Sequence, residues 1–100
     1  MRTDKELLII LRDYMIAYFK SKRITGVCSA ATHLHLYNKV NAAEYVILSN
    51  FLFRNLPKGK YQVERVLNGK YFMVKGESFC WKPCSLKPRL NWIKKQIERL

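Results

Sequence analysis

The densest group of chemically capable residues lies in the segment FCWKPCSLKPRLNW, at positions 79–92. Its cysteines, Cys80 and Cys84, could join Cys28 and a histidine as four ligands for zinc. A closed structural zinc site normally has a close pair of ligands at each end, and here only one close pair is present. His33 and His35, two positions apart on an expected helix, point in different directions. The sequence therefore predicts packed cysteines and no metal site.

Catalytic groups are sparse. The chain has seven acidic residues, and none of them forms a recognisable carboxylate pair or joins a nucleophile constellation. A Gly-rich phosphate loop and the common hydrolase motifs are also missing from the sequence. We therefore predict a binding protein without a cofactor, and no enzyme.

The end of the chain places tryptophans beside cations. On the expected last helix, Trp92 lies about 120° from the centre of the apolar stripe. An indole among cations can stack on a base, while a guanidinium forks onto a phosphate. This pattern predicts a ligand-binding corner made of Trp81, Lys82, Arg89, Trp92, Lys95 and Arg99. Alternatively, Trp92 packs as part of a second core layer with Trp81, and the cations form a solvated face.

Charge is the strongest global feature. The chain carries 19 Lys and Arg against 7 Asp and Glu, a net charge of +12. The excess is concentrated after residue 57, where 11 cations face 3 anions. Such an excess attracts phosphate-bearing partners. The alternative is that it only keeps a small protein soluble.

The full chain of 100 residues is long enough for one domain, so we predict a single domain over residues 1–100.

Helices are expected in the first half of the chain. Thr3 and Asn41, each followed three positions later by a glutamate, predict capping boxes that open two helices. The first should run to about Lys22, with an apolar surface so broad that the helix is either central or part of a self-association surface. Between them, small residues at helical spacing predict a second helix over residues 27–37.

After Gly59 the period becomes alternating. Residues 61–67 and 70–75 predict a β-hairpin around an Asn-Gly turn, packed on the helices, with a possible short third strand at residues 79–81. A final helix follows Ser85, with its apolar stripe formed by Leu86, Leu90, Ile93, Ile97 and Leu100. This order predicts an α+β fold of three N-terminal helices, a hairpin and a C-terminal helix.

The apolar runs are too short for a membrane span. Three cysteines without framework spacing fit a reducing compartment. We therefore expect a cytoplasmic protein with no membrane partner.

The final segment WKPCSLKPRLNWIKKQIERL resembles the ending of short, mostly uncharacterised bacteriophage accessory proteins, with looser similarity around TGVCSAATHLHLYNK. In those proteins a Trp-Pro pair leads into a Pro-Arg, a tryptophan and a terminal helix. The resemblance implies a phage gene product that counters host defence, by sequestering a nucleotide signal or by blocking an effector.

Charge and resemblance together predict a non-catalytic, phage-encoded protein that captures a phosphate-bearing ligand in the host cytoplasm. The resemblance alone favours a nucleotide immune signal. The alternatives are a DNA- or RNA-binding accessory protein and a protein inhibitor of a host defence effector. A broad apolar first helix would also suit a homo-oligomer with ligand sites between subunits.

Overall fold

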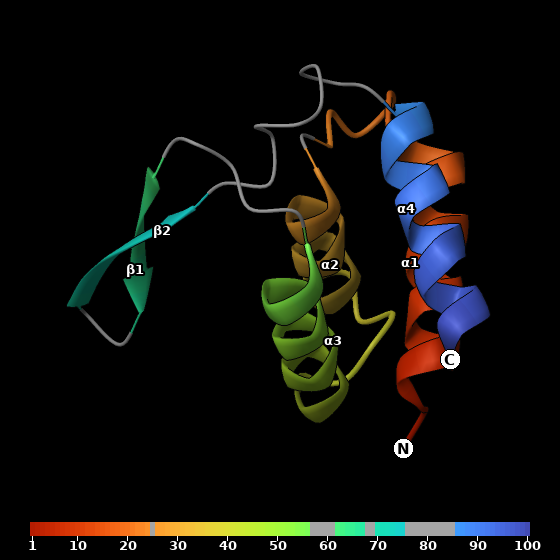
Figure 1. Cartoon of the computed structure of the whole chain (residues 1–100), viewed down its shortest axis with the longest axis horizontal. Helices are drawn as coiled ribbons and strands as arrows, with labels where there is room; N and C mark the ends of the chain where they lie inside the picture. The colour runs from red at the N-terminus through yellow and green to blue at the C-terminus, as the bar shows by residue number, and fades with distance from the viewer. Residues whose placement is uncertain (25, 57–61, 68–69, 76–85) are drawn as a thin grey trace.

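The computed structural model describes residues 1–24, 26–56, 62–67, 70–75 and 86–100 (Figure 1). Within these ranges the chain forms four helices and one pair of strands. In order, these are α1 (Asp4–Tyr18), α2 (Val27–Leu36), α3 (Ala42–Asn55), β1 (Gln62–Leu67), β2 (Lys70–Lys75) and α4 (Leu86–Arg99).

Side-chain caps fix the starts of α1 and α3. The Thr3 hydroxyl accepts from the backbone N–H of Glu6 at 3.3 Å, and the Glu6 carboxylate accepts from the Thr3 N–H at 3.1 Å. Asn41 and Glu44 make the same reciprocal pair, at 2.8 and 3.1 Å. These bonds satisfy backbone donors that the first turn of a helix leaves without a partner. Both predicted capping boxes are confirmed.

The first helix is shorter than predicted, because it ends at Tyr18 rather than near Lys22. Arg23 has a left-handed backbone, with φ of 51°, through which a right-handed helix cannot continue. The backbone N–H of Ile24 then bonds to the carbonyl of Phe19 at 3.0 Å. This turn buries Ile24 and leaves Lys22 and Arg23 exposed.

Helix α1 lies at the centre of the packing. It contacts α2, α3 and α4, while α2 also packs against α3. Helix α4 lies beside α1 and runs in the opposite direction, so the two chain ends lie at the same end of this pair (Figure 1). The central position explains why Leu7, Leu8, Leu11 and Met15 are all fully buried. The homo-oligomer stays a prediction, but the broad apolar surface of α1 no longer argues for it.

Helices α2 and α3 also contribute side chains to the core. Ala30 and Ala31 of α2 are buried, and small side chains allow this helix to approach α1 closely. Leu48, Phe51 and Leu52 of α3 are buried.

The predicted α+β fold is wrong. The described core is built from the four helices and their connections, which is an all-α arrangement. The backbones of β1 and β2 pair antiparallel, but the two strands lie to one side of the helices and are not packed as a layer against them (Figure 1). An alternating pattern with an Asn-Gly turn specifies local pairing only, and nothing in it determines where the pair packs. The turn itself and the possible third strand lie outside the described residues.

None of the described helices is both long and apolar enough to span a membrane.

Candidate functional site

The buried face of α4 differs from the predicted apolar stripe. Arg89 and Ile93 have no exposed surface, Gln96 is 7% exposed, and the expected core residue Leu100 is 52% exposed. At 100° per residue, the centre of this buried face lies about 50° from the centre of the predicted stripe. The rotation is toward Trp92.

This rotation changes the predicted ligand-binding corner. Arg89 does not project to the surface, because its guanidinium carbon lies in the core, 6.0 Å from the centre of the Phe19 ring. The long arginine stem can pack like an apolar side chain, which a hydrophobic pattern does not register. Trp92 is half-buried and packs against the core, as in the alternative interpretation of this residue. Trp81 and Lys82 lie outside the described residues, and a ligand-binding role for the corner stays a prediction.

The opposite side of α4 is rich in cations. Lys87, Lys94, Lys95 and Arg99 are all exposed there, and we call these four residues the outer face of α4. The positions span about 18 Å along the helix axis, from a rise of about 1.5 Å per residue. Glu98, the acidic residue of this helix, is exposed on the same side, so that side carries four cations and one anion. Lys95 and Arg99, which were predicted as site residues, therefore remain on an open, positively charged surface.

A partly buried ion pair engages one of the acids elsewhere. The Glu44 side chain is 4% exposed and accepts from Arg2 Nε at 2.7 Å and from Arg2 Nη2 at 2.8 Å. These bonds, together with the cap bond to Asn41, lower the pKa of Glu44 to about 2. Glu44 therefore carries its charge at neutral pH, but that charge is compensated within the fold.

Two more acids are occupied locally. Arg12 Nε donates to Asp13 at 3.1 Å. Glu6 serves the cap of α1, and its bonds to Thr3 lower its pKa. Asp13 is therefore paired with a cation, and Glu6 is engaged in the cap of its own helix.

A second arrangement of rings and a cation is formed by α1, α2 and the residues that directly follow each helix. Tyr18 is 40% exposed and Tyr37 is 53% exposed; we call these two residues the tyrosine pair. The Lys22 ammonium lies 5.2 Å from the centre of the Tyr18 ring and 4.5 Å from the centre of the Tyr37 ring. Both distances are typical of cation–π contacts.

The rings of Tyr14 and His33 pack against the tyrosine pair. Tyr14, which is buried, places its ring 4.9 Å from that of Tyr18 and its hydroxyl 3.4 Å from His33 Nδ1. The His33 ring lies in turn 5.9 Å from that of Tyr37. Burial, with Tyr37 and Tyr18 nearby, raises the pKa of Tyr14, so its hydroxyl stays neutral at physiological pH.

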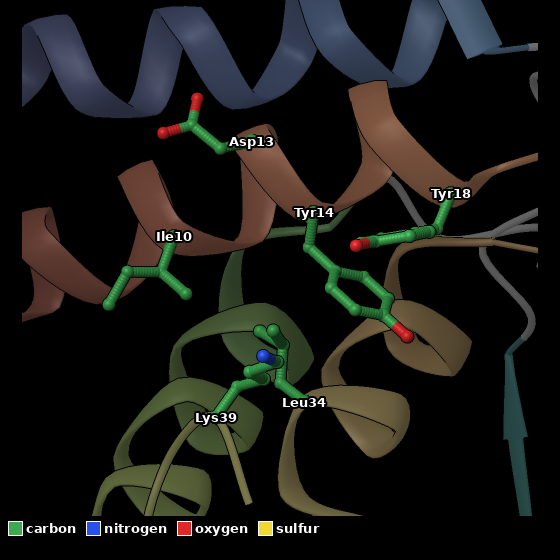
Figure 2. A pocket seen from close by; sticks show the side chains of 6 residues that line it. All are labelled: Ile10, Asp13, Tyr14, Tyr18, Leu34 and Lys39. Carbon is green, nitrogen blue, oxygen red and sulfur yellow. The ribbon is translucent and has the colours of Figure 1, made fainter. Parts of the chain in front are cut away.

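A shallow groove runs along this side of α1. Its volume is about 290 Å³, and its lining includes Tyr14 and Tyr18 from α1, Leu34 from α2 and Lys39 from the following connection. Asp13 also lines the groove, and Figure 2 shows its carboxylate on the side of α1 that faces α4, while the Tyr14 ring is directed toward α2, next to the Tyr18 ring. The cationic Lys39 therefore borders the groove.

Sequence reasoning missed this cluster. The available signals were the four-residue spacings of Tyr14 with Tyr18 and of His33 with Tyr37, each of which places two rings on one side of a helix. Nothing in these spacings shows that the two sides face each other when α1 packs against α2, or that Lys22, four residues after Tyr18, also reaches Tyr37.

The two histidines point in different directions, as predicted. His33 contacts Tyr14, whereas His35 stacks on Tyr45 with ring centres 4.9 Å apart. Within the described ranges, no three histidine, cysteine or acidic side chains gather as a metal site would require. Cys80 and Cys84 lie outside those ranges, so the prediction about them is untested.

No protein-family model, curated protein or solved structure matches this chain.

Proposed function

We propose that this protein binds nucleic acid, and that the phosphate backbone lies along the outer face of α4. The observation that carries the proposal is the set of four exposed cations on that face. Successive phosphates of one DNA strand advance by about 3.4 Å along the duplex axis, so a face of about 18 Å is long enough for about five of them.

The shape of the described surface favours a polymer over a small nucleotide. Sites for small ligands are concave and bury most of the ligand. The groove beside the tyrosine pair has a volume of about 290 Å³, and a second groove, lined in part by Arg2, Lys39 and Glu44, has about 350 Å³. Both lie open on the surface. A row of cations on a convex helix suits a chain of phosphates, each of which needs one contact.

The cellular setting of this proposal is the cytoplasm, and it is the host cytoplasm if the bacteriophage resemblance of residues 81–100 holds. The charge distribution supports a partner that carries many phosphates. Capture of a nucleotide immune signal becomes one outcome of the test below.

The test is a fluorescence-anisotropy titration with single- and double-stranded DNA and RNA between about 50 and 200 mM salt. Each lost phosphate contact lowers the slope of log K against log salt by about 0.9 for duplex DNA and about 0.7 for single strands. Lys94→Gln with Lys95→Gln should therefore lower the slope by about 1.4 to 1.8. The matched control is Lys5→Gln with Arg54→Gln, which removes two exposed charges from other helices.

An equal loss in the α4 variant and the control would contradict the proposal, because net charge alone would then explain binding. The proposal would also be contradicted if the wild-type protein bound none of the oligonucleotides. If a calorimetric panel of cyclic nucleotides then gave binding, the small-nucleotide hypothesis would replace this one.

A further inference from the structure

The tyrosine pair consists of two partly exposed rings beside several cations, and Asp13, the acid that lines the adjoining groove, is paired with Arg12. Tyr18 and Tyr37 are 40% and 53% exposed. Both rings contact the ammonium of Lys22, so their centres lie within about 10 Å of each other. Two exposed rings this close together form a platform on which flat groups can stack.

The platform is held in place by its neighbours. Tyr14 packs under Tyr18, and His33 packs against both Tyr14 and Tyr37. The contact between the Tyr14 hydroxyl and His33 Nδ1 joins the two halves. Rings that are already ordered lose little side-chain entropy when a ligand binds, so more of the stacking energy appears as affinity.

Charge determines which flat group would bind. The sequence contains no Asp or Glu between Asp13 and Glu44, and within that interval it has Lys20, Lys22, Arg23 and Lys39. The three cations of the connection after α1 are exposed. This environment repels a cationic guest, which an aromatic cage would otherwise take. It attracts a base that is attached to phosphate.

We propose that Tyr18, Tyr37 and Lys22 form a base-stacking site for single-stranded nucleic acid. The inference rests on the proposed function and adds a strand preference to it. A single strand offers the faces of its bases to the tyrosine pair, while the Lys22 ammonium moves from the rings to a phosphate. In a duplex the base faces are stacked on one another and cannot contact the tyrosine rings, so a duplex binds only through its phosphates to the cations.

The experiment compares Tyr18→Leu with Tyr37→Leu, as a double variant, against Tyr18→Phe with Tyr37→Phe. The probes are a single-stranded oligonucleotide and a duplex of the same sequence, at one salt concentration. The leucine variant should lose at least about tenfold in affinity for the single strand, roughly 1.4 kcal/mol, and keep its duplex affinity. The phenylalanine variant should bind like wild type, because it keeps both rings.

Two further measurements make the result specific. Phe53→Leu removes an exposed ring from α3 and should leave both affinities unchanged. A single strand containing 5-bromouracil should form photo-cross-links to Tyr18 or Tyr37 in the wild-type protein. This readout needs no variant, so it holds even if the leucine variant folds poorly.

Wild-type affinity of the leucine variant for the single strand would overturn this inference, as would an equal loss for single strand and duplex. In either case the α4 variants would still decide the proposed function. If the wild-type protein bound no nucleic acid at all, both proposals would be wrong.

Discussion

Two of the contacts between a cation and an aromatic ring in the described part of the chain differ in their surroundings. In one, Arg89 of α4 lies 6.0 Å from the Phe19 ring and has no exposed surface. In the other, Lys22 lies 4.5 Å from the exposed Tyr37 ring. The residue types are comparable, but the buried contact holds two helices together and the exposed one is accessible to a ligand.

The difference has an energetic basis. A cation–π contact contributes about 0.5–1 kcal/mol at an exposed site and about 2 kcal/mol or more where water is excluded. Arginine keeps its charge in either place, so a buried guanidinium depends on its neighbours for compensation. Removing Arg89 should therefore cost stability, whereas removing Lys22 should cost mainly ligand affinity.

The largest expected effect comes from Arg89→Ala. The substitution leaves a cavity between α4 and the core, and it should lower the free energy of unfolding by about 2–4 kcal/mol. Arg89→Met keeps an apolar stem of similar reach and should lose clearly less. Urea denaturation of the three proteins measures the difference.

The contrast between the buried and the exposed contact would be wrong if Arg89→Ala had the wild-type midpoint of urea unfolding but a lower affinity for nucleic acid. Arg89 would then be a ligand contact, as the sequence pattern predicts. Trp92→Leu gives an independent check, because a half-buried core tryptophan should also lower stability when it is truncated.

The starts of the helices could be predicted from sequence because they depend on local chemistry. Thr3 with Glu6, and Asn41 with Glu44, interact across three residues, and no distant contact is needed to form these bonds. The breadth of the apolar surface of α1 predicted that this helix is either central or self-associating. The contacts of α1 with the other three helices show the central position.

The rest depended on contacts between distant segments. The orientation of α4 is set by α1, and a pattern of apolar residues could not show that Arg89 would be buried. Lys22 lies one helical turn after Tyr18, with its N–H bonded to the Tyr18 carbonyl at 3.0 Å, but its contact with Tyr37 depends on how α2 packs against α1. The pairing of β1 with β2 is local, but its place relative to the helices is not, which is why the fold class was wrong.

A smaller effect on stability is expected for Glu44. This residue tests how much a buried carboxylate that is paired with an arginine contributes to the free energy of unfolding. Its pKa is lowered to about 2 by Arg2, so its stabilising effect is complete above the usual glutamate pKa and is lost as the pH falls toward about 2. Wild-type stability should therefore decline across that window. Glu44→Gln should be less stable at neutral pH and show a flatter acid profile.

Thermal melts at a series of acidic pH values measure this effect. Glu98→Gln on α4 is the matched control, because that glutamate is exposed. Parallel acid profiles for wild type and Glu44→Gln would mean that the Arg2 pair contributes nothing, and that a buried charge in this fold needs no local partner.

The smallest expected effect on stability is that of the tyrosine pair. Tyr18→Leu and Tyr37→Leu change side chains that are 40% and 53% exposed, and each should shift the free energy of unfolding by no more than about 0.5 kcal/mol. Lys22→Gln should be equally mild, because the ammonium makes its ring contacts in water, where they are weak. Urea denaturation under the conditions used for Arg89→Ala gives the direct contrast. If the tyrosine variants lost as much stability as Arg89→Ala, their rings would be a second core supported by Tyr14 and His33, and the exposed contact would be structural like the buried one.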